Sequence, residues 1–144
     1  MTSLSINQAK VFIGHGHSLV WMQLRDFLKD RLGLEWDEFN RIPVAGLTAL
    51  QRLQQMLDTS SFAFIIFTGD DETKDGVPQA RQNAVHELGL FQGRLGFDRA
   101  VVLLEEGCAE FSNIAGLQQM RFPVNNIMAI SEDIRRVLED RLIG

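Results

Sequence analysis

The residues of this chain that could do chemistry gather in three short segments. The first, Gly14–Ser18, has the sequence Gly-His-Gly-His-Ser and follows a short apolar run. Its glycines would let a ligand approach the backbone closely, and the helix expected to follow offers free N–H groups to a phosphate. The segment matches neither a dinucleotide fingerprint nor a P-loop, so a plain glycine turn explains it equally well. A metal site on His15 and His17 is not expected, because no further ligands lie nearby in the sequence.

The second segment, Thr68–Glu72 with Asp75, is acidic and follows an all-apolar run. Loop carboxylates of this kind can hold Mg²⁺. A solvated turn, whose charges keep the loop off the core, explains the same residues and is the interpretation that we prefer.

The third segment is Arg81–Gly93, in which Asn83 and Glu87 stand four residues apart and therefore share one face of a predicted helix. A glutamate inside a helix is ordinarily a solvated surface residue, and spacing alone favours that interpretation. Gly89 and Gly93 each cost a helix about 1 kcal/mol relative to alanine. We therefore expect a neighbouring element or a ligand to approach the helix closely at these glycines.

Composition narrows the class of protein. The 144 residues are 45% hydrophobic and 23% charged, which is typical of a globular domain. The net charge of −5 argues against a nucleic-acid partner, and the longest apolar run, Phe62–Phe67, is too short to span a membrane. A lone Cys108 excludes an internal disulfide and suits a reducing cytoplasm. We expect one cytoplasmic domain over residues 1–144, with no nucleic-acid or membrane partner.

Short apolar runs alternate along the chain with amphipathic stretches. The runs predict strands at residues 10–14, 34–39, 62–68, 100–104 and 127–130, the second of them at an edge. The stretches predict helices over 18–32, over 46–58, from Pro78 onward and from Ser131 onward. All-apolar strands that alternate with helices predict a parallel α/β sheet covered on both faces, and five strands fit the flavodoxin-like order 2-1-3-4-5.

Helical periodicity also predicts which side chains face the core. Ser18 and Ser131 are expected as N-caps and Gly33 as a helix stop. The inward stripes are Leu47, Leu50, Leu53 and Leu57, then Ala84, Leu88 and Phe91, and finally Ile134, Val137, Leu138 and Leu142. Trp36 and Phe39, near the second strand, are either interface aromatics or half-buried core residues, and we favour core packing.

Ligands of such sheets bind beyond the carboxyl ends of the strands, at the switch point between the first and third strands. This rule selects Gly14–Ser18 and Thr68–Glu72. A phospho-acceptor receiver domain has the same strand order, but it needs an acidic pair after the first strand and a lysine after the fifth. The chain has Gly14–His15 and Ser131–Glu132 at those places, which excludes a receiver.

Taken together, the segments resemble the bacterial TIR-like domains that form the effector ends of anti-phage proteins, including those fused to STING-type and cyclic-nucleotide sensors. The matching pieces, in chain order, are Val11–Ser18, Glu38–Arg41 with Gly46, Phe62–Phe64 leading to Thr68–Glu72, Arg81–Gly96, and Phe111–Ile114 with Gly116. They cover nearly the whole chain, and Arg81–Gly96 is the most specific of them.

The resemblance implies a flavodoxin-like TIR fold and cleavage of NAD⁺ to nicotinamide and ADP-ribose, linear or cyclic. NAD⁺ is then the substrate, and no cofactor or metal is implied. It also implies that a fused or separate sensor activates the domain by assembling it into oligomers. Glu87 matches the catalytic glutamate of the family, and Asn40–Gly46 matches the BB loop, beside the site and at TIR–TIR contacts. The substrate-binding residues carried over are Gly14, His15, Gly16, His17, Ser18, Arg41, Asp71 and Asn83.

One carboxylate is sufficient for that reaction. Glycosidases generally need a second carboxyl group to protonate the leaving group, whereas the pyridinium of NAD⁺ departs as neutral nicotinamide. An ionised Glu87 would stabilise the oxocarbenium charge that develops on the ribose. Two alternatives stay open: a nucleoside deoxyribosyltransferase-like enzyme with a glutamate nucleophile, and a non-catalytic module for assembly or nucleotide binding. If the Glu87 carboxyl lay on the outer surface, away from the strand ends, only a docking module would remain.

Overall fold

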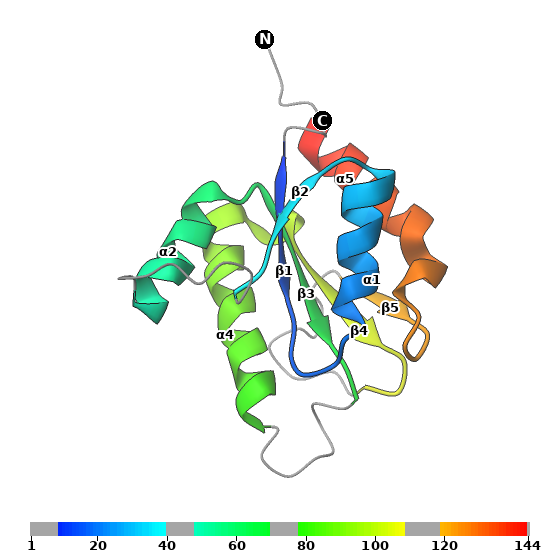
Figure 1. Ribbon diagram of the computed structural model, residues 1–144, viewed down its shortest axis with the longest axis horizontal. Coiled ribbons are helices and arrows are strands. Elements are labelled where there is room, and N and C mark those ends of the chain that lie inside the picture. The colour runs from blue at the N-terminus through cyan, green and yellow to red at the C-terminus, as the bar shows by residue number, and fades with distance from the viewer. Residues whose placement is uncertain (1–8, 40–47, 70–77, 109–118, 144) are drawn as a thin grey trace.

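The computed structural model describes residues 9–39, 48–69, 78–108 and 119–143. Its sheet has five parallel strands in the order β2-β1-β3-β4-β5 (Figure 1). The strands are β1 Lys10–Gly14, β2 Glu35–Asp37, β3 Phe62–Phe67, β4 Ala100–Glu105 and β5 Gln119–Phe122. The predicted α/β class and strand order are confirmed.

Helices cover both faces of the sheet. On one face lie α1 (Trp21–Asp26), which continues as a π-helical turn over Phe27–Arg31, and α5 (Ser131–Ile143). On the other lie α2 (Ala49–Thr59) and α4 (Pro78–Leu95), as Figure 1 shows. Two short 3₁₀ helices, Phe97–Arg99 and Ile127–Ile130, precede β4 and α5.

The central strand β3 is buried along its whole length because each face meets a helix layer. Phe62, Phe64 and Ile66 pack toward α1 and α5, and the alternate residues Ala63, Ile65 and Phe67 pack toward α2 and α4. The same alternation continues into β4, which is also fully buried. Both cores therefore hold the carboxyl ends of β1, β3 and β4 at one end of the molecule, the end from which α4 begins (Figure 1).

The predicted fifth strand is wrong. Residues 127–130 form a 3₁₀ helix that leads into α5, and the edge strand β5 is Gln119–Phe122. Ile127 is the fully buried residue of the 3₁₀ helix, whereas Ala129 is exposed, so its apolar run does not lie in a sheet. Because β5 is a half-buried edge with an exposed Arg121, its sequence lacks the continuous apolar pattern that marks the central strands.

The predicted start of the first helix is also wrong. The helix begins at Trp21 with Val20 at the N-cap, and Ser18 Oγ accepts a hydrogen bond from the Val20 amide in the preceding turn. The predicted stop is confirmed at Gly33, whose φ of +67° is a left-handed conformation that favours glycine.

The second helix has a different inward stripe from the one predicted. Thr48 is its N-cap and forms a reciprocal capping box with Gln51, which sets the rotation of the first turn. Leu50 consequently points outward and is 75% exposed. The buried residues of α2 are Arg52, Leu53, Met56 and Leu57. Leu47 lies outside the described residues.

A buried ion pair joins α2 to the end of β2. Arg52 Nη2 donates to Asp37 Oδ1 at 2.8 Å, and the two side chains are 9% and 5% exposed. Asp37 Oδ1 also accepts from the Glu38 amide at 2.9 Å, and Arg52 Nη2 lies 3.4 Å from the Glu38 carbonyl oxygen. The pair therefore fixes the backbone of Glu38 from both sides.

Removal of one member of this pair leaves the other charge buried and uncompensated. We predict that Asp37→Ala lowers the free energy of unfolding by about 3–5 kcal/mol, measured by urea denaturation. Asp58→Ala is the matched control, because the Asp58–Arg94 pair also involves α2, which it joins to α4, but both of its side chains are about half exposed. It should cost less than about 1 kcal/mol, and equal costs for the two variants would contradict the argument.

Candidate functional site

The site is built where the end of β1 meets the middle of α4. Gly14 pairs in register with Ile65 of β3. A Cβ atom on Gly14 would lie 2.6 Å from Ile65 Cδ1 and 3.0 Å from Glu87 Oε1. The missing side chain at Gly14 therefore creates the space in which the Glu87 carboxyl group lies against the strand end.

The Glu87 carboxyl group is half-buried, and its environment changes its acidity. Burial raises its pKa from 4.5 to about 7, because removal from water disfavours the charged form. His15 acts in the opposite direction and lowers this pKa, and the like charge of Glu38 raises it further. At neutral pH the group is therefore poised between its neutral and ionised forms.

His15 is held on three sides. Its Nδ1 lies 2.8 Å from the Gly16 carbonyl oxygen, and its Nε2 lies 2.9 Å from Glu38 Oε2. The ring also stacks on the Trp21 indole, with centroids 4.4 Å apart and planes 6° from parallel. Because a carbonyl oxygen and a carboxylate both accept, the imidazolium, which donates from both nitrogens, satisfies this arrangement fully.

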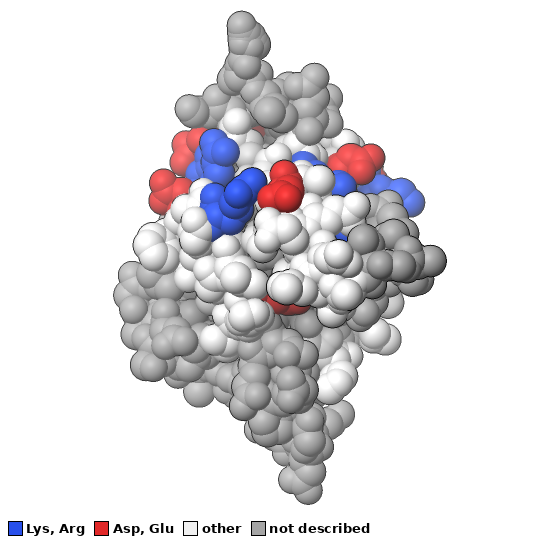
Figure 2. Space-filling model, turned by 90° about the vertical axis from the view of Figure 1, so that its left-hand side faces the viewer, with Lys and Arg blue, Asp and Glu red and all other residues white. Residues whose placement is uncertain are grey.

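A pocket of about 270 Å³ opens beside Glu87 and is lined by Phe39, Ala49, Leu53, His86 and Glu87. Figure 2 shows the face formed by α2 and α4, where most of the charged side chains gather in the upper part and the middle is largely uncharged, with one small acidic patch. The pocket is large enough for one flat ring of a ligand. It combines an apolar wall with a single carboxyl group, which suits an aromatic, positively charged group.

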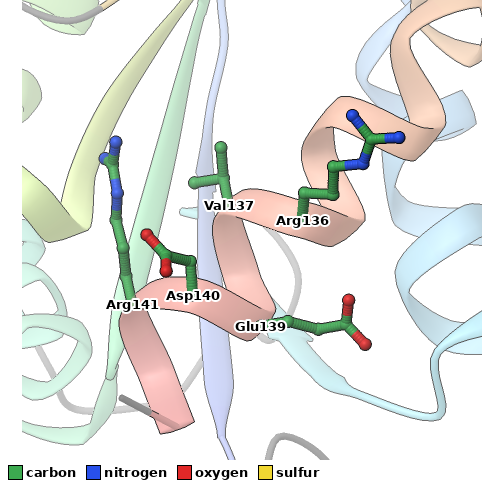
Figure 3. Close-up of a pocket in the computed structure, with 5 residues that line it drawn as sticks. All are labelled: Arg136, Val137, Glu139, Asp140 and Arg141. Carbon is green, nitrogen blue, oxygen red and sulfur yellow. The ribbon is translucent and has the colours of Figure 1, made fainter.

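A larger, open depression of about 580 Å³ lies over α5 (Figure 3) and is lined by Arg136, Val137, Glu139, Asp140 and Arg141. The side chains fan out in different directions, with Arg136 and Arg141 well apart. Arg141 donates to the Asp98 carbonyl oxygen at 2.7 Å. The depression has no convergent set of groups, so we place the candidate site at the smaller pocket.

Another buried carboxylate ties the strand ends together. Glu105, at the end of β4, accepts from the Gly69 amide at 2.9 Å and from the Asn125 amide at 3.0 Å. Asn125 has a φ of +58°, a left-handed conformation that asparagine tolerates. This clamp joins the end of β3 to the turn after β5, beside the switch point. Sequence reasoning missed Glu105, although a charged residue that closes an apolar run is a usable signal.

Of the predicted substrate-binding residues, Gly14 ends β1, and His15, Gly16, His17 and Ser18 follow it at the carboxyl end of the sheet. The structure brings His15 within electrostatic reach of Glu87, whereas His17 is exposed. Arg41, Asp71 and the predicted BB loop Asn40–Gly46 lie outside the described residues, as does the side chain of Asn83. Within the described ranges, no group of three His, Cys, Asp or Glu side chains could hold a metal ion.

Sequence reasoning did not select Glu38 or His86 as site residues. Glu38 directly follows β2, an edge strand whose charges give no sign of burial, and only the sheet brings it to His15. Trp36 and Phe39 are half-buried against the two cores, as we favoured. The expectation for Gly89 and Gly93 is not met by the described residues, none of which lies within 4 Å of an added Cβ at either position.

Comparison with known proteins identifies the family. The family model for the TIR domain of CAP12/Pycsar effector proteins matches residues 10–123, which include the whole sheet and α4. The chain belongs to this family. The resemblance to bacterial TIR-like effector domains is thereby confirmed.

Relatives of this TIR domain occur in several bacteria. The chain is 31% identical to the Escherichia coli K12 protein YuaY over 113 residues, which are 75% of the chain and 38% of YuaY. It is 40% identical to the Burkholderia cepacia Pycsar effector protein BcPycTIR over 81 residues, 49% of the chain and 26% of that protein. It is 25% identical to CD-NTase-associated protein 12 of Flavobacterium daejeonense over 143 residues, 90% of the chain and 44% of that protein.

The chain thus spans less than half the length of these relatives. Among the helices of the described residues, none combines the length and the hydropathy that a membrane span requires.

The close approach of Gly14 to β3 and α4 can be tested by adding one methyl group. We predict that Gly14→Ala lowers the free energy of unfolding by about 1–3 kcal/mol, because the fully buried Ile65 must move. Gly89→Ala is the matched control, because this exposed helical position has open space around it in the described structure. It should stabilise the domain by up to about 1 kcal/mol. A Gly14→Ala domain as stable as wild type would contradict the packing argument.

The burial of Glu87 predicts how stability depends on pH. Since the pKa is about 7 in the folded state and 4.5 in the unfolded state, the folded state binds more protons between these values. The free energy of unfolding should therefore fall by about 3 kcal/mol as pH rises through this interval, at about 1.4 kcal/mol per pH unit. Glu87→Gln should remove this fall, so that the variant is more stable than wild type above pH 7.

Urea denaturation at several pH values between about 5 and 8 measures this difference. Glu106→Gln changes an exposed glutamate, so the free energy of unfolding of this variant should depend on pH as that of wild type does. Parallel profiles for wild type and Glu87→Gln would show that Glu87 titrates normally.

Proposed function

We propose that this TIR domain is an NAD⁺ glycohydrolase that cleaves NAD⁺ to nicotinamide and ADP-ribose, linear or cyclic, with Glu87 as the catalytic carboxylate. The observation that carries the proposal is the half-buried Glu87 carboxyl group, set against the Gly14 backbone and lining a ring-sized pocket. Membership of the CAP12/Pycsar effector TIR family supports it.

The pocket suits the nicotinamide end of the substrate. Phe39, Ala49 and Leu53 offer an apolar wall to the flat pyridinium ring, and Glu87 offers an opposite charge. As the N-glycosidic bond breaks, the ring takes up the bonding electrons and leaves as neutral nicotinamide, and positive charge moves to the ribose. A carboxylate held in a partly desolvated site stabilises that charge more strongly than one in bulk water.

The backbone after β1 supplies the second half of the site. Gly14–Ser18 lies at the carboxyl end of the sheet, where the first turn of a parallel α/β fold generally meets phosphate groups. In this proposal Glu87 acts at the sugar–pyridinium bond, and Gly14–Ser18 holds the pyrophosphate. Water then adds to the ribose carbon that nicotinamide has left and loses a proton, which gives ADP-ribose, or an adenine nitrogen of the same molecule adds to this carbon, which gives the cyclic product.

We propose that the domain acts in anti-phage defence and becomes active on assembly. The relatives include a protein named CD-NTase-associated protein 12 and one named a Pycsar effector protein, and each is more than twice as long as the matched region. A sensor for a cyclic nucleotide, fused or separate, would bring TIR domains together. The predicted contact segment is the BB loop Asn40–Gly46.

The proposal predicts nicotinamide release from NAD⁺ when the domain is forced to assemble, for example by fusion to a tetrameric coiled coil. Glu87→Gln should lower that release at least 100-fold while the circular dichroism spectrum stays unchanged. Activity of the wild-type assembly should rise with pH through about 7, because the ionised carboxylate is the active form. Liquid chromatography of NAD⁺ and its products measures both effects.

Glu106→Gln is the matched control, an exposed glutamate whose loss should leave the rate unchanged. If Glu87→Gln assemblies remain as active as wild type, Glu87 is not the catalytic group. Binding of NAD⁺ without turnover in the assembly would favour the non-catalytic module. A covalent sugar adduct on Glu87 formed from a nucleoside would favour the deoxyribosyltransferase-like alternative.

A further inference from the structure

Glu38 is a buried residue whose backbone and carboxylate both have hydrogen-bond partners. It is 5% exposed, and the Asp37–Arg52 pair holds its backbone amide and carbonyl groups. Its Oε2 lies 2.9 Å from His15 Nε2. Burying a charged group costs free energy, so we expect Glu38 to have a role that a solvent-exposed glutamate would not have.

The ring that Glu38 contacts is held equally firmly. Gly16 accepts from one side of His15, and Trp21 stacks against its face. Trp21 is itself covered by the Arg25 guanidinium group, 5.3 Å from the ring centroid. With oxygen acceptors at both ring nitrogens, His15 meets its surroundings best as an imidazolium cation, and Glu38 supplies the charge that balances it.

We propose that Glu38 is a positioning residue that holds the His15 imidazolium, so that a cation stays within reach of the Glu87 carboxylate. The consequence for catalysis rests on the proposed glycohydrolase function, but the electrostatic part does not. Glu38 acts through His15, which bridges the end of β1 to the residue after β2.

Two opposing effects reach Glu87 from this pair. Direct repulsion by Glu38 raises the pKa of Glu87, and attraction by His15 lowers it, with His15 having the larger effect. Within the described part of the chain, two neighbouring elements bring further charged or titratable groups to the site. On the side of β2 and α2, Asp37 and Arg52 neutralise each other, and on α4 His86 lines the same pocket. Loss of Glu38 therefore removes a weak repulsion and weakens a stronger attraction.

This balance predicts that Glu38→Gln affects the pKa of Glu87 differently when His15 is present and when it is replaced. With His15 present, Glu38→Gln removes the carboxylate that holds the His15 ring at 2.9 Å, so the attraction of His15 for Glu87 weakens and the pKa of Glu87 rises by about one pH unit. With His15→Gln, the charge of His15 is already absent. Glu38→Gln then removes only repulsion, so the pKa of Glu87 falls or stays unchanged.

The experiment is a carbon-13 NMR titration of glutamate carboxyl groups, with the Glu87 signal assigned by its absence in Glu87→Gln. Four proteins are titrated: wild type, Glu38→Gln, His15→Gln and the double variant. Glu35→Gln is the matched control, an exposed glutamate on β2 that should leave the Glu87 titration unchanged. The proposal is supported if Glu38→Gln raises the pKa of Glu87 when His15 is present and does not raise it in the His15→Gln background. The proposal is overturned if Glu38→Gln shifts the pKa of Glu87 equally with and without His15, or if it does not raise this pKa when His15 is present.

Activity of forced assemblies gives a second readout. Glu38→Gln should shift the acid limb of the pH–rate profile to higher pH by the same number of pH units as the pKa of Glu87. The rate at high pH should stay near that of wild type. An assembly of wild type that releases no nicotinamide would refute the glycohydrolase function, while the NMR titration would still decide the role of Glu38. Should Glu38→Gln fail to fold, His15→Gln alone must raise the pKa of Glu87, and an unchanged value overturns the proposal.

Discussion

The withdrawal of one carboxyl group from water is the constraint on which the rest of this structure depends. Glu87 lies on a helix whose neighbours are a bare glycine backbone and a fully buried isoleucine, Gly14 and Ile65. The helix can come this close only because Gly14 has no side chain. Partial burial raises the pKa of Glu87 to about 7. The same lack of solvent would strengthen its interaction with a developing positive charge.

Charges arranged across three elements counteract that burial. Arg52 of α2 pairs with Asp37, Asp37 holds the backbone of Glu38, and Glu38 contacts His15 after β1. Each partner in this series satisfies a group that would be costly to bury alone. The end result is a cation near Glu87, which favours the ionised form that burial disfavours. The site thus combines a desolvated carboxyl group, whose pKa is raised to about 7, with a neighbouring histidine that partly offsets the rise.

The size of the pocket bears on the proposed activation by assembly. The described pocket of about 270 Å³ accommodates a ring, not a whole dinucleotide. In the proposed function, the remaining contacts come from Gly14–Ser18 and from a second domain copy near the BB loop. The chain spans less than half the length of these relatives.

Patterns local in the chain determined the positions of the first four strands, the inward face of α4 and the left-handed stop at Gly33, because periodicity and glycine conformation act over a few residues. The strand order followed from a general rule for alternating parallel α/β folds. A resemblance, with helical spacing, selected Glu87. Only the tertiary structure decided the capping of α2 that turns Leu50 outward, the edge strand β5, and the contact of Glu38 with His15. These features depend on groups far apart in sequence meeting across the sheet, and burial and charge balance exist only once they have met.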